Sequence, residues 1–128
     1  MLPKIMETET MFIPLSTPVC NSKLASVGDA LYVIGGKWKL RIIIALNGGN
    51  TRFNELQHAI PGISAKVLSN ELKDMELSGF VTRTVDTGTP VVVTYTPTTY
   101  THTLKNVLEA LADWGTMHRE KLRAEAIR

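Results

Sequence analysis

The stretch TRFNELQHAIPGISAKVLSNELKDMELSGF, residues 51–80, decides the fold of this chain. Its apolar residues recur at helical spacing in two segments, so one short helix is expected over residues 52–60 and another from Ser64 to Leu77. Pro61-Gly62 breaks the chain between them, and the Ser64 hydroxyl suits an N-cap because it can accept a hydrogen bond from a free backbone amide of the first turn. Two helices joined by a tight turn of this kind form a helix-turn-helix, here residues 52–77.

Beyond Gly79 the sequence pattern changes from helical to extended. Phe80–Asp86 and Val91–Thr96 are rich in β-branched residues, and Thr87-Gly88-Thr89-Pro90 supplies a turn between them. They predict a β-hairpin, a wing over residues 80–96. Apolar residues then return at helical spacing, which predicts a long C-terminal helix over residues 98–125.

Two more helices are expected before the helix-turn-helix. The first has apolar residues at positions 24, 27, 31 and 34 and ends at Gly35-Gly36, and the second, Lys37–Leu46, is apolar on more than one side. Residues 1–19 hold three prolines and no sustained period, so we expect a flexible N-terminal arm there. The order of elements predicts a mainly α fold with a small β-hairpin (α+β), a winged helix-turn-helix in residues 20–128 with extra helices at both ends.

Composition and length favour one globular domain. The chain has 128 residues, 44% of them hydrophobic and 20% charged, and a net charge of +2. The single cysteine excludes an internal disulfide framework and a Cys-rich zinc site. The longest apolar run, Ile42–Leu46, is far shorter than the ~20 residues of a membrane-spanning helix, and the start lacks the apolar segment of a secretion signal. We therefore expect a soluble, cytoplasmic protein with no membrane partner.

Motifs of catalysis are missing from the sequence. It has no Gly-rich phosphate loop, no nucleophile elbow and no HExxH motif. The three histidines, His58, His102 and His118, are scattered along the chain. We therefore expect neither an enzyme nor a metal or cofactor site.

Positive charge is concentrated in the middle of the chain. Residues 36–66 contain five basic residues and one acidic residue, Glu55. Such a patch suits contact with phosphate groups. An ordinary solvated surface is equally compatible with it, so charge alone does not decide between the two.

Several segments together resemble the HxlR-type transcriptional regulators, a bacterial family of the winged helix-turn-helix class. The matching segments are Cys20, IGGKWKLRII (34–43), RFNEL (52–56), PGISAKVLSNELKDME (61–76), SGFVTR (78–83), the VTYTPT region and Trp114-Gly115. The resemblance implies a homodimer that binds double-stranded operator DNA, with terminal helices that pair the two copies. The sequence departs from the family at Pro97, where a leucine is usual, and at Thr101, where a glycine is usual. Both departures fall at the expected start of the last helix.

The first DNA-contact candidates lie on the second helix of the motif, which enters the major groove in this class. If Leu68, Leu72 and Met75 are buried, a turn of about 100° per residue places polar side chains on the opposite face. The candidates on that face and at the helix start are Ser64, Ala65, Lys66, Ser69, Asn70 and Lys73. Asn70 could pair with adenine, and Lys66 with guanine or a phosphate. The alternative is a merely solvated face, since any amphipathic helix is polar outside.

Contacts to the DNA backbone are expected from Lys37, Lys39, Arg52 and the free amides at the start of the Ser64 helix, where the helix dipole favours phosphate. An ordinary solvated charge is the alternative for Lys39. The candidates in the wing are Arg83, Thr87 and Thr89, although the tip itself contains no Lys or Arg.

The terminal helices carry more apolar residues than one small domain needs to cover them. The predicted dimer interface consists of Leu24, Leu31, Leu104, Leu108, Leu111 and Trp114. A dimer would space two recognition helices to match a palindromic operator. Packing of the same residues inside one chain is the alternative.

Cys20 has no cysteine partner and is expected just before the first helix. A nearby helix N-terminus can lower the pKa of a thiol and raise its reactivity. Some members of the resembling family sense electrophiles or oxidants through a cysteine in this region, which makes Cys20 a candidate redox sensor. A small buried side chain is the alternative.

The sequence as a whole predicts a DNA-binding transcriptional regulator that acts as a homodimer. Control by Cys20 or by an unidentified small-molecule effector is left open. The alternative from another class is a winged-helix protein-interaction module that does not bind DNA. An apolar outward face on the Ser64 helix would favour that alternative, and only Leu77 is expected to be both apolar and exposed there.

Overall fold

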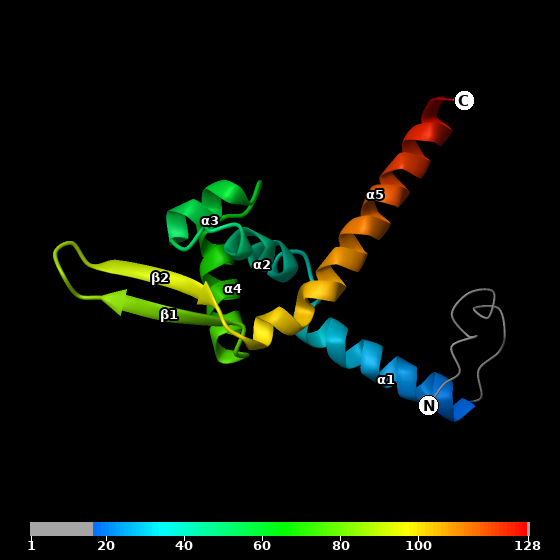
Figure 1. Ribbon diagram of the computed structural model, residues 1–128, viewed down its shortest axis with the longest axis horizontal. Helices are drawn as coiled ribbons and strands as arrows, with labels where there is room; N and C mark the ends of the chain where they lie inside the picture. The colour runs from blue at the N-terminus through cyan, green and yellow to red at the C-terminus, as the bar shows by residue number, and fades with distance from the viewer. Residues whose placement is uncertain (1–16, 128) are drawn as a thin grey trace. The chain divides into compact units, whose positions relative to one another are not determined.

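The structure, a computed structural model, describes residues 17–127 and falls into two compact units that divide at Gly35-Gly36. The first unit contains helix α1 (Thr17–Ile34). The second contains α2 (Lys39–Asn47), α3 (Phe53–Ala59), α4 (Ala65–Leu77), β1 (Val81–Asp86), β2 (Val92–Pro97), the 3-10 helix η3 (Tyr100–Leu104) and α5 (Lys105–Ile127) (Figure 1). A mostly helical chain with one hairpin is the predicted winged helix-turn-helix fold.

Helix α1 begins at Thr17, earlier than the apolar spacing predicted. Pro18 falls in its first turn, a position that proline favours because its missing amide donor is not needed there. Cys20 therefore belongs to the first turn of α1, and the expectation that it precedes the first helix is wrong. Most of the expected flexible arm, residues 1–16, lies outside the described residues.

Helices α2, α3 and α4 share one apolar core in the second unit. Its most deeply buried large side chains are Ile42 and Ile43 of α2, Leu56 of α3, and Leu68, Leu72 and Met75 of α4. The spacing of apolar residues thus predicted the buried face of α4 correctly. Because adjacent residues of α2 are both buried, this helix is covered on more than one side, as its sequence indicated.

The turn of the helix-turn-helix has the predicted chemistry. Gly62 adopts a φ of 85°, a left-handed backbone conformation that glycine accepts without strain. The Ser64 Oγ accepts a hydrogen bond from the Val67 backbone amide at 3.1 Å, which confirms Ser64 as the N-cap of α4. These two residues fix the start of α4 relative to α3.

The wing is a two-stranded antiparallel hairpin in which Arg83 lies opposite Tyr95. Its base is attached to the helix-turn-helix, because the Tyr95 amide donates to the Thr51 carbonyl oxygen at 2.7 Å. The rest of the hairpin extends away from the helices (Figure 1).

The C-terminal segment begins with the short 3-10 helix η3 and not with the single continuous helix that the sequence predicted. Two threonines fasten this junction: Thr98 Oγ1 donates to the Gly79 carbonyl at 2.6 Å, and the buried Thr101 hydroxyl donates to the Phe80 carbonyl. A glycine at position 101, as the family pattern expects, could not make the second bond. Helix α5 then projects from the core, and none of its described residues is buried (Figure 1).

Candidate nucleic-acid interface

The outward face of α4 is solvent-exposed along its whole length, and it is polar except for Leu77 at its C-terminal end, which is 87% exposed, as the sequence predicted. Lys66, Ser69, Asn70 and Lys73 are all exposed, and they lie opposite the buried Leu68, Leu72 and Met75. Ala65 is exposed at the start of the helix. The predicted contact residues are therefore brought together on one accessible surface, backed by the core.

A groove of about 250 Å³ separates α4 from the wing. It is lined by Ser69, Leu72, Lys73, Glu76, Arg83 and Tyr95. The structure thus brings together Lys73 of the helix and Arg83 of the wing, which the sequence predicted separately as DNA contacts. Tyr95 was missed. The strand pairing, which places Tyr95 opposite Arg83, is the signal that could have found it.

Lys39 does not face outward as expected. Its Nζ lies 2.6 Å from Glu71 Oε1 and 3.8 Å from Asp74 Oδ2, and the Lys39 and Glu71 side chains are only 17% and 22% exposed. This ion pair joins the start of α2 to the middle of α4. The prediction of a phosphate contact at Lys39 is therefore corrected: the Lys39 ammonium group pairs with carboxylates of α4 and links α2 to α4.

Arg52 is exposed at the start of α3, next to a carboxylate that caps the helix. Glu55 Oε1 accepts hydrogen bonds from the backbone amides of Thr51 (2.9 Å) and Arg52 (3.1 Å). These bonds stabilise the ionised form and hold the pKa of Glu55 below its ordinary value of 4.5. Arg52 thus has a fixed negative charge beside it.

Lys37 lines a cleft between α2 and α5, so the structure does not gather it with the residues of the α4 groove. Its Nζ lies 4.8 Å from the centroid of the Trp38 ring, within the range of a cation–π contact.

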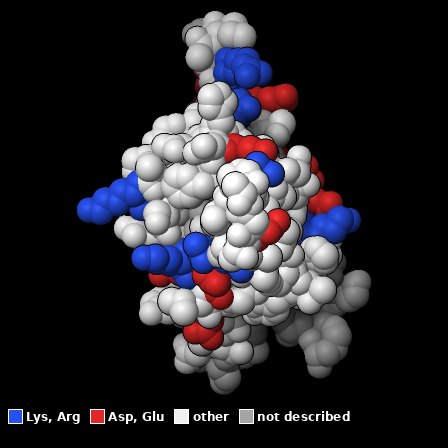
Figure 2. Space-filling view, turned by 90° about the vertical axis from the view of Figure 1, so that its left-hand side faces the viewer, with Lys and Arg blue, Asp and Glu red and all other residues white. Residues whose placement is uncertain are grey.

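The tip of the wing carries no positive charge. Thr87 and Thr89 are exposed, and Asp86 Oδ1 accepts a hydrogen bond from the Gly88 amide at 3.0 Å. On the face from which the hairpin projects, basic and acidic side chains are interspersed and form no continuous basic patch (Figure 2). Arg83, nearer the base of the hairpin, is the basic residue of the wing.

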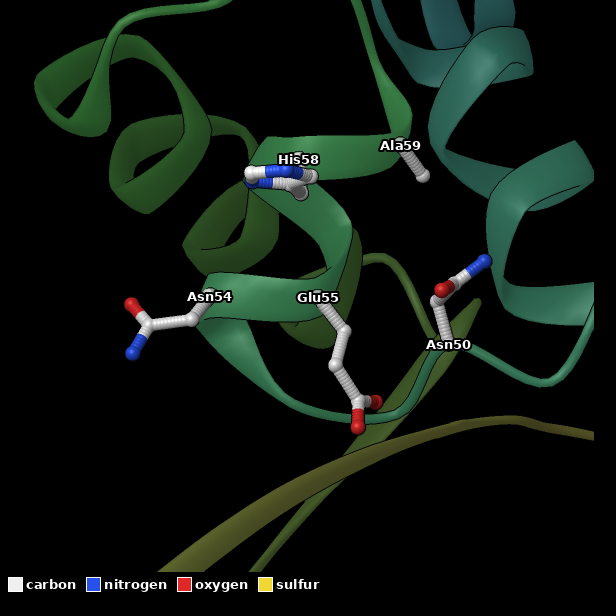
Figure 3. A pocket seen from close by; sticks show the side chains of 5 residues that line it. All are labelled: Asn50, Asn54, Glu55, His58 and Ala59. Carbon is white, nitrogen blue, oxygen red and sulfur yellow. The ribbon is translucent and has the colours of Figure 1, made fainter.

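The side chains that line a shallow depression of about 450 Å³ along α3 do not converge on a common point (Figure 3). They point in different directions, with Asn54 and His58 turned away from Asn50 and Glu55 (Figure 3). The Asn50 amide already donates to the Ala45 carbonyl at 2.9 Å, and Glu55 is engaged as a cap. Within residues 17–127 no group of three or more His, Cys, Asp or Glu side chains is arranged to hold a metal ion.

The predicted interface residues of the terminal helices are largely exposed. In α5, Leu111 and Trp114 are 51% and 59% exposed and Leu108 is half-buried. Leu104 of η3 is also half-buried, while in α1 Leu24 and Leu31 are 71% and 62% exposed. Trp114 stacks on His118 with ring centroids 4.9 Å apart. Each helix therefore presents an apolar surface.

No helix in the described part of the chain is long and apolar enough to cross a membrane.

The three-helix core, the exposed face of α4 and the wing define a winged helix-turn-helix protein, a class that binds DNA. The chain belongs to the HxlR-like helix-turn-helix family, which matches residues 33–123. The sequence resemblance is thus confirmed, and the chain is a DNA-binding transcriptional regulator of this type.

Individual relatives agree with this assignment. The chain is 38% identical over 93 residues to the uncharacterized HTH-type transcriptional regulator YtcD of Bacillus subtilis (strain 168), covering 73% of this chain and 74% of YtcD. The reduced form of the redox regulator HypR is similar in structure, with a TM-score of 0.71 and 33% identity over 77% of this chain and 98% of HypR. The reduced form of the transcriptional regulator YodB from B. subtilis gives a TM-score of 0.61 and 34% identity over 78% of this chain and 91% of YodB.

Proposed function

We propose that the protein binds operator DNA as a homodimer, with α4 in the major groove and the wing against the adjacent backbone. The observation that carries this proposal is the outward face of α4, where Lys66, Asn70 and Lys73 are exposed. In the described part of the chain none of the three takes part in an ion pair or side-chain hydrogen bond. Their donors and acceptors are available to base edges and phosphates.

Base recognition is assigned to Asn70 and Lys66. The Asn70 amide can donate to and accept from the edge of an adenine, and Lys66 can donate to a guanine or to a phosphate near the start of the helix. Ser69 and Ala65 allow close approach because their side chains are small. The Ser64 hydroxyl is committed to the Val67 amide, so Ser64 contributes by placing the helix start.

Backbone contacts are assigned to Arg52, Lys73 and Arg83. Lys73 and Arg83 line the same groove between α4 and the wing, where a strand that passes from one to the other would place a phosphate. Thr87 and Thr89 at the tip can add neutral hydrogen bonds. Since the tip is uncharged, it should contribute less to the salt dependence of binding than Arg83 does.

Dimer formation is supported by the exposed apolar surfaces of α1 and α5. An isolated chain would leave Trp114, Leu111 and Leu24 in water, and contiguous exposed apolar surface is typical of interaction sites. Two copies related by a two-fold axis would present two α4 helices to a palindromic operator.

Redox control through Cys20 is a second proposal. Cys20 lies in the first turn of α1, and cysteines near helix N-termini are in general more reactive. It is supported by the similarity to HypR, which is described as a redox regulator and has been solved in reduced and oxidized forms. We propose no catalytic activity and no cofactor.

A salt series of DNA binding tests the main proposal. Fluorescence anisotropy is measured with genomic fragments, including the DNA upstream of the protein's own gene, and the logarithm of the affinity should fall linearly with the logarithm of the salt concentration. Lys66→Ala and Asn70→Ala should each weaken binding to the preferred fragment by about 1–3 kcal/mol. Lys121→Ala, which removes an exposed lysine of α5, is the matched control.

Two outcomes contradict the proposal in different ways. Full operator affinity in both α4 variants would remove α4 from base recognition. No preference for any fragment, with reduced or oxidised protein, would favour the interaction module that binds no DNA. Repeating the series after treatment with an oxidant, on wild type and Cys20→Ser, tests the redox proposal.

A further inference from the structure

A cleft between α2 and α5 has the size of a small-molecule site. Its volume is about 510 Å³, within the range of roughly 300–1,000 Å³ that ligand pockets occupy. It belongs entirely to the second unit and is separate from the α4 groove, since the two share no lining residue. The proposed binding of DNA by α4 and the wing gives this cleft no role.

The charge of the cleft has one sign. Lys37 and Arg41 line it from the α2 side and Arg119 from α5, and no acidic residue lines it. Within residues 17–127 none of these three side chains pairs with a carboxylate. Arg41 donates to the Lys37 carbonyl oxygen, and both cations lie near the Trp38 ring, so two of the three are held in place. Such a site is complementary to an anion.

The floor of the cleft is apolar. Ile44 is 55% exposed although it belongs to the central helix, and half-buried Leu108 faces it from α5. An inorganic anion would leave this surface in water, whereas a ligand with an apolar body would cover it.

Gly115 leaves space in the middle of the cleft. A Cβ at this position would meet no atom within 4 Å, so the packing within the described chain does not require glycine. Glycine in a helix interior costs about 0.5–1 kcal/mol relative to alanine. A ligand that closely approaches the backbone of α5 would account for the glycine at position 115.

The stripe of α5 that lines the cleft is not the one with the most exposed aromatic residue. Leu108, Gly115 and Arg119 fall on one side of the helix at intervals of seven and four residues, while Trp114 and Met117 are turned from them by about 100° or more. Leu108 and Leu111 line the cleft and are also predicted interface residues, so a second copy would border the cleft. A copy that packs mainly on Trp114 and Met117 would leave the side of the cleft that carries Arg119 accessible.

We infer that the α2–α5 cleft binds a small organic anion that has an apolar body, such as an aromatic carboxylate. Its carboxylate pairs with Arg119 and Lys37, and its ring system lies on Ile44 and Leu108 against Gly115. The proposal does not depend on DNA binding.

Isothermal titration of the full-length protein tests this site with a defined probe. The probe is 1-naphthoate, and the controls are 1-naphthalenemethanol, which has the same rings without the charge, and acetate, which has the charge without the rings. We expect saturable binding of 1-naphthoate at one site per chain and at least tenfold weaker binding of both controls, because a charge-assisted contact to arginine and burial of the rings each contribute on that scale.

Two variants locate the site, with a matched control. Arg119→Gln should weaken 1-naphthoate binding about tenfold, and Arg123→Gln, one turn further along α5 and outside the cleft, should not change it. Gly115→Leu should abolish binding by filling the space, while its helical circular dichroism stays that of wild type because a side chain has room there.

Three results would overturn the inference: no saturable binding, equal binding of the uncharged analogue, or wild-type binding in both Arg119→Gln and Gly115→Leu. The first is also the result expected if helices of the second copy fill the cleft.

Discussion

Removal of the Lys39–Glu71 ion pair should lower both the stability of the protein and its affinity for DNA. The two side chains come from α2 and α4, 32 residues apart in sequence, and their charged atoms are 2.6 Å apart. With exposures of 17% and 22%, the pair is largely shielded from water, so Lys39→Met would leave Glu71 desolvated without a partner. Hydrogen bonds to charged groups contribute about 1.5–3 kcal/mol, and we expect a loss in this range in the free energy of unfolding.

The chain contains a matched control for this prediction. Lys121 and Glu125 on α5 are also 2.6 Å apart, but their side chains are 59% and 47% exposed. An exposed helical pair of this type is worth only about 0.3–0.5 kcal/mol. The two pairs have the same N–O distance but differ in burial, and only the Lys39–Glu71 pair joins two helices.

Double-mutant cycles measured by urea unfolding at one fixed protein concentration give the two coupling energies. The variants Lys39→Met, Glu71→Gln and their combination are compared with Lys121→Met, Glu125→Gln and their combination. We expect a coupling above about 1 kcal/mol for the first cycle and below about 0.5 kcal/mol for the second. Equal couplings in the two cycles would refute the argument that the α2–α4 pair is shielded. Operator affinity that is unchanged in Lys39→Met would show that the pair does not position α4.

Three further predictions concern other parts of the structure. Thr101→Val should lower the free energy of unfolding by about 1–3 kcal/mol in urea titrations, since it leaves the Phe80 carbonyl without its hydroxyl donor, and a change below about 0.5 kcal/mol would contradict this. Because the pKa of Glu55 is lowered in the folded state, its ionised form stabilises the fold above pH 4.5, and this stabilisation is lost as the pH falls through the folded pKa. Glu55→Gln should therefore have a lower urea midpoint than wild type at neutral pH and converge with it in acid, and a difference independent of pH would show that ionisation is irrelevant. Trp114→Lys should shift the protein from dimer to monomer in sedimentation equilibrium, because the exposed apolar surface of α5 is interrupted by a charge, whereas an unchanged mass would exclude Trp114 from the interface.

The sequence was sufficient to predict the helix-turn-helix because its signals are local. The burial of Leu68, Leu72 and Met75 follows from helical spacing, and the start of α4 follows from the Ser64 cap. Once the buried face of a helix is known, its outward face is known as well. The exposed residues of α4 could therefore be predicted without knowledge of the neighbouring elements.

Features that depend on contacts between elements could not be predicted in the same way. Lys39 resembles any surface lysine in sequence, and its role depends on Glu71, which folding brings to it. Tyr95 lies in the α4 groove only because the strand register places it opposite Arg83. The early start of α1 has a local signal in Pro18, because proline favours the first turn of a helix, but the spacing of apolar residues does not contain this signal.

The hydrogen bond between the Tyr95 amide and the Thr51 carbonyl has a consequence for how such a protein can diverge. It attaches the base of the hairpin to the start of α3, while the tip between Asp86 and Val92 makes no comparable attachment to the helices in the described chain. Insertions or exchanges at the tip can therefore change how far the wing extends without moving Arg83. The hairpin tip is accordingly a natural place to graft longer or more basic sequences when a regulator of this kind is redesigned for a new operator.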